Sequence, residues 1–202
     1  MSRQTERSQD TRGRLLGVAR ALFAERGYAQ VGTEEIVAQA EVTRGALYHH
    51  FADKRDLMRA AYEQVEEEVV AAIGKAVAEA GSEDPIEVMK IAVGAFFDLA
   101  LESERARIAL VEAPVALGWD EWREIDMRYG LGLTCALLQA GIDAGRIAPV
   151  PVKPLGHMLV AALGEAGIMI ATAPDPQRAR ADVEPGLMAM IDGLASGSGA
   201  SS

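Results

Sequence analysis

The chain has 202 residues, half of them hydrophobic, which is enough for one large core or for a small domain packed on a bigger one. The single cysteine, Cys135, excludes an intramolecular disulfide, and the polar first residues lack the apolar stretch of a secretion signal, so we expect a cytoplasmic protein. A formal net charge of −10 excludes a uniformly basic surface.

The charge is unevenly distributed along the chain. Residues 1–57 hold nine Lys and Arg against eight Asp and Glu, a balance of +1, whereas the remainder holds 11 against 22, a balance of −11. An acidic C-terminal part repels a phosphate backbone and discourages sequence-blind binding. The near-neutral N-terminal part is therefore the place where localised contacts with a polyanion are to be expected.

Nearly every segment has a helical period, and no alternating run bounded by hairpin turns is found, so we predict an all-α fold of about nine helices. Residues 1–9 are polar and predicted to be flexible, and residues 196–202 (SGSGASS) are predicted to form a disordered tail. The predicted helices are 11–26, 33–40, 43–50, 54–80, 85–101, 103–113, 120–144, 155–172 and 176–194.

Capping residues and glycines set the predicted helix ends. Thr33 and Asp53 are expected to cap the helices that follow them, and Asp84 with Pro85 is a typical helix start. Gly27 and Gly145 are expected to end helices, as glycine does one position beyond the last turn. Proline predicts the remaining breaks: Pro114 ends a helix, Pro149, Pro151 and Pro154 form a stiff connector, and Pro174 and Pro176 form a turn.

The two short helices 33–40 and 43–50 have the proportions of a helix-turn-helix, whose second helix lies in the major groove of DNA. Their apolar residues are predicted to pack on the first helix, which carries Leu15, Val18, Ala19, Leu22 and Phe23 on one face. The inward residues of the pair are Ile36, Ala40, Val42, Leu47 and Phe51. The outward residues are Thr43, Arg44, Gly45, Tyr48 and His49.

The outward residues suit contact with DNA. Arg44 can make a bidentate contact with guanine, and Gly45 lets the backbone approach base edges, so Thr43, Arg44 and Gly45 are the predicted base-reading residues. Hydroxyl, imidazole and ammonium groups donate to phosphates without reading sequence. The predicted phosphate contacts are Thr33, Tyr48, His49 and Lys54.

Several stretches in order resemble the tetracycline-repressor (TetR) family signature: residues 23–28 (FAERGY), Thr33, residues 42–51 (VTRGALYHHF) and Lys54. The resemblance covers roughly residues 10–58. It implies a three-helix DNA-binding head at 10–57 and a helical regulatory and dimerisation domain at 58–195, working as a homodimer on a palindromic operator and released by a small ligand. Glu41 departs from the pattern, because the family often has glycine in that turn.

Each of these side chains also has an ordinary structural interpretation. Tyr48, His49 and His50 fit the edge of a helix packed on its neighbour, and a short helix pair occurs in many bundles. Metal ligation by His49 and His50 is disfavoured, because adjacent helical residues point about 100° apart and no partner set has ligand spacing. We predict no metal and no cofactor.

The segment from residue 85 to residue 144 is rich in large apolar side chains, most of which must be core. Tryptophan and methionine also line adaptable ligand pockets. The candidate pocket residues are Met89, Val93, Phe96, Phe97, Glu112, Trp119, Trp122 and Met127, with Asp98, Asp126 and His157 as further polar candidates.

The last two helices combine small and large apolar residues, which permits close helix packing in an isologous dimer. A helix central to its own monomer is the alternative. A membrane span over residues 154–173 is disfavoured because the run contains His157 and Glu165. The candidate interface residues are Leu159, Ala161, Leu163, Gly164, Gly167, Ile168, Leu187, Met190 and Ile191.

These patterns favour a DNA-binding transcriptional regulator, a repressor whose partners are a double-stranded operator, a second copy of itself and a small, largely apolar effector. One alternative is a constitutive or architectural DNA-binding protein without a ligand. The other is an enzyme on a helical scaffold, but no nucleophile-base set, phosphate-binding glycine loop or metal cluster is visible in the sequence.

Overall fold

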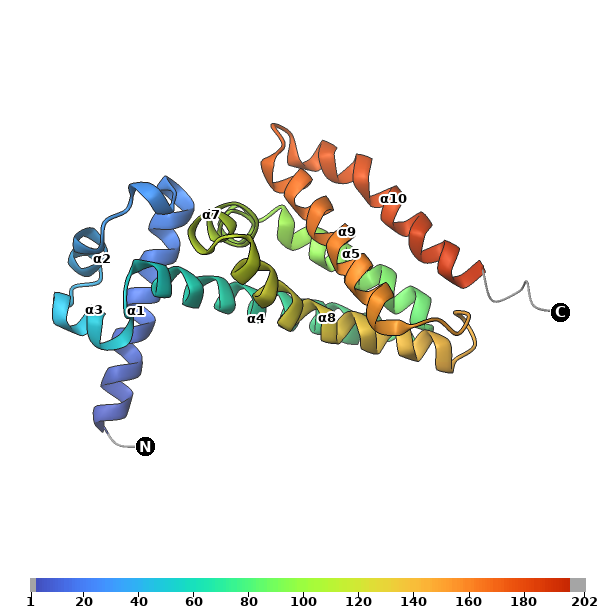
Figure 1. Cartoon of the computed structure of the whole chain (residues 1–202), viewed down its shortest axis with the longest axis horizontal. Helices are drawn as coiled ribbons and strands as arrows, with labels where there is room; N and C mark the ends of the chain where they lie inside the picture. The colour runs from blue at the N-terminus through green and yellow to red at the C-terminus, as the bar shows by residue number, and fades with distance from the viewer. Residues whose placement is uncertain (1–2, 197–202) are drawn as a thin grey trace. The chain divides into compact units, whose positions relative to one another are not determined.

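The computed structural model describes the backbone of residues 3–196 and the side chains of residues 8–102 and 104–195. Every regular element in that range is helical, which confirms the all-α prediction (Figure 1). Nine helices are present among the described residues if the contiguous α6, η2 and α7 are counted as one and the three-residue 3-10 helix at Tyr28–Gln30 is left out. The predicted tail at 196–202 lies outside the described residues except for Ser196, the last residue of α10.

The chain divides into two compact units. The first contains residues 1–65 and 103–122, and the second contains residues 66–102 and 123–202. The prediction divided the chain in sequence order after residue 57, whereas packing places residues 103–122 with the N-terminal helices. We call these residues segment 103–122.

The first unit is built on α1. Its buried residues include Leu15, Ala19, Leu22 and Phe23, four members of the predicted face. Ile36, Ala40, Leu47 and Phe51 are buried as well, while Val42 is only partly buried. The elements are α1 (Arg3–Arg26), the 3-10 turn η1 (Tyr28–Gln30), α2 (Thr33–Gln39), α3 (Arg44–His50), the start of α4 (Lys54–Ala80), α6 (Ser103–Ala106), the π-helical turn η2 (Arg107–Glu112), α7 (Ala113–Leu117) and the start of α8 (Trp119–Asp143).

The second unit is a helical bundle. It contains α5 (Pro85–Ala100), α9 (Val152–Thr172) and α10 (Pro176–Ser196) together with the later parts of α4 and α8. Helices α5, α9 and α10 pack against one another (Figure 1), around a core that includes Phe97, Ile170 and Ile191. The chain therefore has two separate hydrophobic centres, one in each unit.

Most predicted caps are confirmed. The Asp53 carboxylate accepts the Asp56 amide at 2.7 Å, and the Asp84 carboxylate accepts the Ile86 amide at 3.0 Å. Gly27 and Gly145 have φ values of +87° and +67°, the left-handed conformation that glycine adopts without a steric cost. Thr33 was wrongly expected to cap α2, because the N-cap position is Gly32 and no side chain caps that end.

Three predicted boundaries are wrong. Helix α9 begins at Val152 rather than Leu155, so Pro154, predicted to lie in the connector, is in its first turn, where a missing N–H is tolerated. Helix α1 begins at Arg3 rather than near Thr11, so the helix runs into the polar stretch predicted to be flexible. Pro114 does not end a helix, because it lies in the first turn of α7, where its missing N–H is tolerated. The π-helical turn η2 precedes that start and resets the hydrogen-bonding register of the chain.

One helix, α9, is long and apolar enough to cross a membrane by length and composition, and 33% of its most apolar window is buried within the protein. That is weak evidence for a span, because a core helix of a soluble protein passes the same test.

Candidate nucleic-acid interface

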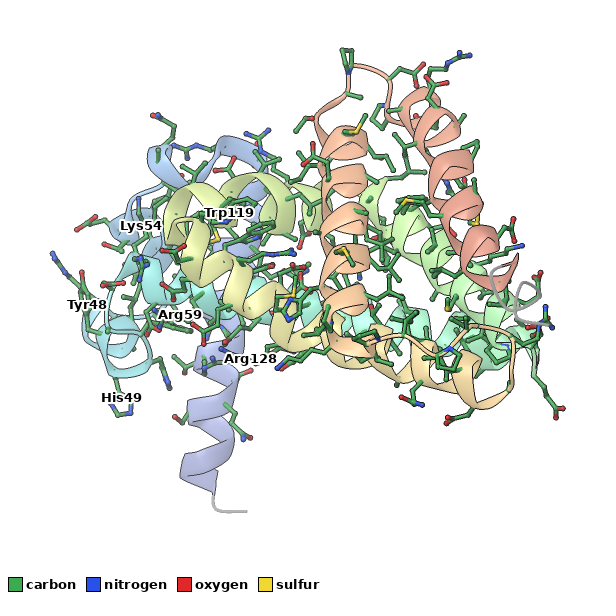
Figure 2. The ribbon with its side chains drawn as sticks, turned by 45° about the vertical axis from the view of Figure 1, so that its right-hand side comes forward. Tyr48, His49, Lys54, Arg59, Trp119 and Arg128 are labelled. Atoms are coloured by element: carbon green, nitrogen blue, oxygen red, sulfur yellow. The ribbon has the colours of Figure 1, made fainter. Side chains whose placement is uncertain are left out.

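Helix α3 presents one face to solvent and buries the other. Leu47 is fully buried, whereas Thr43, Arg44 and Gly45 are exposed. Figure 2 shows Tyr48 and His49 projecting from the outer side of α3, and both are exposed. The structure therefore places all the predicted outward residues of this helix on one accessible face.

The N-terminal end of α3 is fixed by Thr43. Its hydroxyl oxygen accepts the Ala46 amide at 3.1 Å, which is the capping geometry that threonine provides. A Cβ atom added at Gly45 would meet only the Thr43 Oγ1 atom, at 3.8 Å. Packing within the protein therefore does not require glycine at position 45.

The turn between α2 and α3 contains Glu41, a non-glycine residue in a sterically unfavourable backbone conformation. Glu41 has a φ of +52°, the only positive value among the described non-glycine residues. The Arg14 guanidinium bridges the turn, because it donates to the carbonyl of Ala40 and, at 3.4 Å, to that of Glu41. The turn keeps its left-handed residue although the chain has glutamate where glycine is favoured.

Arg44 has two neighbours in the protein. Its Nη1 atom lies 3.4 Å from Oε1 of Glu34 in the first turn of α2, and its guanidinium carbon lies 5.6 Å from the centroid of the Tyr48 ring. Both charged side chains are exposed. The guanidinium is thus held at the surface between a carboxylate and an aromatic ring.

Thr33 and Lys54, the other two predicted phosphate-contacting residues, have partners within the protein. Thr33 is partly buried, and its hydroxyl lies 3.4 Å from the Glu34 carboxylate. Lys54 is turned toward its own unit, because Nζ donates to the carbonyls of Tyr28 and Val31, each at 3.0 Å, and lies 4.2 Å from the centroid of the Tyr28 ring. Lys54 therefore fixes η1 to the start of α4, and only its third N–H can reach another partner.

The two histidines at the end of α3 are in ring contact, with centroids 5.1 Å apart. Burial, followed by the charges of His49 and Arg12, lowers the pKa of His50. Arg12 also lies over the Phe51 ring, with its guanidinium carbon 5.1 Å from the centroid. Arg12 of α1 and His50 of α3 thus lie close together beside the exposed face, and sequence patterns gave no sign of that pairing.

Glu112 has a different environment from the predicted pocket. It is buried in the first unit, where its carboxylate accepts the Tyr28 amide at 2.8 Å and the Arg107 Nε–H at 3.2 Å. A Cβ atom added at Gly27 would lie 3.4 Å from both carboxylate oxygens. Glu112 therefore joins η2 to the turn after α1, a contact between residues too distant in sequence for a pattern to reveal.

Segment 103–122 makes further polar contacts with α1 and α4. The Arg20 guanidinium pairs with Glu104 at 2.9 Å, and Arg55 donates to the Leu117 carbonyl at 2.7 Å. Glu121 pairs with Arg55 and with Arg59. Burial raises the pKa of Glu121, but the hydrogen bonds and charges of the two arginines outweigh it and lower the pKa overall. The segment is thus bound to the N-terminal helices by charge as well as by packing.

The other predicted pocket residues are divided between the two units. Met89, Val93 and Phe97 are buried in the core of the second unit, Phe96 packs against that core, and Met127 is partly buried in the same unit. Trp122 is buried in the first unit and donates its indole N–H to the Ala109 carbonyl at 2.8 Å. Trp119 packs on Trp122 but is 63% exposed.

The further polar candidates also differ from one another. Asp98 and His157 are exposed, and Asp98 is paired with Arg180. Asp126 is largely buried beside Arg123, and burial raises its pKa from 3.8 to about 6 against the opposing effect of that arginine. Among the described residues no group of three or more His, Cys, Asp or Glu side chains could hold a metal ion.

The candidate interface residues on α9 and α10 have mixed exposure. Gly164, Gly167, Leu187 and Ile191 are buried within the second unit, while Leu159, Leu163 and Ile168 are partly buried. Ala161 and Met190 are exposed. The large apolar side chains that α9 exposes are those of Met158 and Met169, which were not among the predicted interface residues.

Comparison with known proteins bears on both units. A family model described as bacterial regulatory proteins, tetR family, matches residues 15–61, and a tetracyclin repressor-like C-terminal domain model matches residues 86–194. A crystal structure of a TetR-family transcriptional regulator from Pectobacterium atrosepticum is similar with a TM-score of 0.81 and 31% identity, covering 96% of this chain and 98% of that one.

Two curated relatives show where the sequence similarity lies. The transposon Tn10 TetC protein of Escherichia coli is 27% identical over 156 residues, which is 77% of this chain and 78% of that protein. The HTH-type transcriptional regulator AcrR of Shigella flexneri is 41% identical over 70 residues, or 34% of this chain and 33% of that one. The higher identity thus belongs to a match over only a third of each chain.

Proposed function

The chain belongs to the TetR family of bacterial regulatory proteins and is a DNA-binding transcriptional regulator; on that basis we propose that it is a repressor, released from a palindromic operator when a small, largely apolar ligand binds. Steric occupation of a promoter is the mode of repression. The family and its relatives are regulators rather than enzymes, and we assign the protein to the cytoplasm, where its DNA is.

The exposed face of α3 carries this proposal. Thr43, Arg44 and Gly45 lie together at the N-terminal end of a helix whose opposite face is anchored by buried Leu47. A helix presented in this way can enter the major groove, with Arg44 donating to N7 and O6 of guanine and Gly45 admitting the base edges. These three residues are the proposed base-reading set.

Contacts with phosphates would set the register of the helix. Tyr48 and His49 are exposed on the same side of the unit, and Thr33 lies at the start of α2. Lys54 has a double role in the proposal: it secures η1 through two carbonyls and directs its remaining N–H to a phosphate. Its substitution is therefore expected to weaken binding to every DNA sequence.

Dimerisation through α9 and α10 is supported by the exposure of Met158, Met169 and Met190, which are 61%, 50% and 47% accessible in one chain. An isologous partner would cover these exposed apolar side chains and that of Ala161. The buried members of the predicted set, such as Gly164 and Ile191, would support these side chains from within the unit.

The effector is assigned to the second unit, where Met89, Val93, Phe96, Phe97 and Met127 supply apolar and adaptable side chains. In a dimer, a ligand that binds one arrangement of the two DNA-binding heads (residues 10–57 of each chain) better than another shifts the population toward the arrangement it prefers. A head separation that no longer matches successive major grooves then lowers affinity for the operator.

Selection of bound duplexes from a random pool tests the proposal. The wild type should enrich a palindrome, Arg44→Ala should lose discrimination at one base in each half-site, and Lys54→Ala should weaken all sequences alike. Arg178→Ala removes an exposed arginine from α10 and serves as the control, with binding unchanged. Equal affinity of the wild type and both head variants for the selected duplex would contradict the assignment.

A thermal-shift screen of apolar compounds on the DNA-free protein tests the ligand. A compound that binds the native state raises the melting temperature, and it should also compete with the selected duplex. A constitutive DNA-binding protein would enrich an operator in the selection experiment, but no compound would raise its melting temperature and displace the duplex.

A further inference from the structure

The first turn of α2 carries two adjacent carboxylates, Glu34 and Glu35, that pair with different arginines. Glu35 is paired with Arg26 of α1 and thereby helps to hold α2 on its own unit. Glu34 points toward the other side, where its Oε1 atom lies 3.4 Å from Nη1 of Arg44 on α3. A negative charge therefore stands beside the arginine that we assign to base reading, on a surface that would face a polyanion.

The two oxygens of the Glu34 carboxylate have different neighbours. Its Oε2 atom lies 3.4 Å from the Thr33 hydroxyl and 3.5 Å from a Cβ atom added at Gly32, so this oxygen is folded back toward the start of the helix. The other oxygen is left for Arg44. The Arg44 guanidinium thus has that oxygen and the Tyr48 ring as its two neighbours.

Stability of the fold does not account for this pair. The side chains of Arg44 and Glu34 are 66% and 71% exposed, and ion pairs so accessible to water contribute little to folding. The favourable effect of an acidic group at a helix N-terminus is already available from Glu35. A role in binding explains better why a carboxylate lies next to Arg44.

We propose that Glu34 is a specificity-determining residue, which holds Arg44 ready for guanine and opposes its contact with phosphate; this inference rests on the proposed function of α3. A carboxylate at the interface is repelled by the backbone phosphates of every sequence, so it penalises sequence-blind binding. Guanine compensates because its N7 and O6 accept two hydrogen bonds from a guanidinium oriented by the carboxylate and the ring. Glu34 thus increases the difference between operator and other DNA.

The test compares Glu34→Gln with Glu35→Gln, which removes the same charge one residue away. Affinity is measured for the selected operator and for a scrambled duplex of equal length at one salt concentration, with circular dichroism to verify folding. Glu34→Gln should tighten binding to the scrambled duplex by roughly three- to tenfold in a dimer, the effect of releasing one exposed ion pair in each head. Its operator affinity should rise less than twofold, so the specificity ratio falls.

Glu35→Gln should change both affinities by the same factor and leave the ratio unchanged. The inference is overturned if both variants lower the ratio equally, which would indicate net charge alone, or if Glu34→Gln leaves the ratio as in the wild type. A new base preference in sequences selected by Glu34→Gln would also overturn it, because Glu34 would then itself contact a base. A wild type without preference for any duplex would instead contradict the proposed function.

Discussion

Replacing Glu112 by alanine is expected to destabilise the first unit more than any exposed glutamate substitution. The side chain is 11% exposed, and its carboxylate is shared by the Tyr28 amide at 2.8 Å and the Arg107 guanidinium at 3.2 Å. Alanine at position 112 removes both interactions. It also leaves an empty space beside Gly27, which now packs against the carboxylate.

The magnitude follows from these two contacts. A hydrogen bond to a charged acceptor contributes about 1.5–3 kcal/mol, and an ion pair with a half-exposed arginine contributes up to about 1 kcal/mol. Tyr28 is only partly buried, so water can reach its amide and recover part of the loss. We therefore expect Glu112→Ala to lower the free energy of unfolding by about 2–3 kcal/mol. Glu112→Gln, which retains an oxygen acceptor, should lose about half as much.

Urea unfolding monitored by tryptophan fluorescence measures this effect, because both tryptophans of the chain, Trp119 and Trp122, belong to the first unit. Hydrogen exchange at the Tyr28 amide gives a local measure and should accelerate in the variant. Glu79→Ala, which removes only an exposed i,i+4 pair, is the control and should change stability by less than about 0.5 kcal/mol. The reasoning is refuted if Glu112→Ala costs no more than this control and Tyr28 exchange is unchanged.

Three further predictions concern strain, packing and protonation. Glu41→Gly should stabilise the protein by about 1 kcal/mol, seen as a higher melting temperature, because glycine adopts the observed φ of +52° without a steric penalty. Gly156→Ala should destabilise by about 1–3 kcal/mol in urea unfolding, since the new Cβ atom would lie 2.8 Å from the Cys135 sulfur. Burial raises the pKa of Asp126 from 3.8 to about 6, so the uncharged form is favoured in the folded protein. The stability that the wild type gains from the uncharged Asp126 is complete below about pH 4 and is lost as the pH rises through about 6. Asparagine does not ionise, so the stability of Asp126→Asn relative to the wild type should increase by on the order of 3 kcal/mol between about pH 4 and about pH 7.

Each of these has a control that separates its cause from a general effect. Glu41→Ala keeps the steric cost of a Cβ atom, so a gain equal to that of glycine would contradict the strain argument. Gly132→Ala places its Cβ atom in open space on α8 and should be neutral or stabilising, unlike Gly156→Ala. For Asp126→Asn, a difference from the wild type that does not vary with pH would show that burial of the charge is not the cause.

The sequence predicts the features that depend on neighbouring residues. The Asp53 and Asp84 caps each satisfy an amide two or three positions along the chain, so residue type and position located them, although the same rule failed at Thr33. The exposed face of α3 is likewise predictable, because helical periodicity and the buried Leu47 determine which side chains point outward. Local periodicity therefore locates the candidate base-reading residues.

Contacts between distant parts of the chain could not be predicted in the same way. The composition near Glu112 suggested an apolar pocket, yet its partner is the Tyr28 amide, 84 positions away. Lys54 has the residue type of a phosphate contact, but whether its ammonium turns to solvent or to the Tyr28 and Val31 carbonyls depends on where η1 lies. Pro114 is compatible with a helix start as well as with a helix end, and only the position of the π-helical turn before it shows that it begins α7.

The placement of segment 103–122 in the first unit determines how often the chain passes between the two units. Because this segment belongs to the first unit and its flanking residues to the second, the chain passes between the units three times, after Val65, Glu102 and Trp122. The first and third passages lie inside α4 and α8, which continue without a break. Within the first unit, the ion pairs of Glu121 with Arg55 and Arg59 join the start of α8 to the start of α4. The two helices that continue into the second unit are therefore joined to each other by charge within the first.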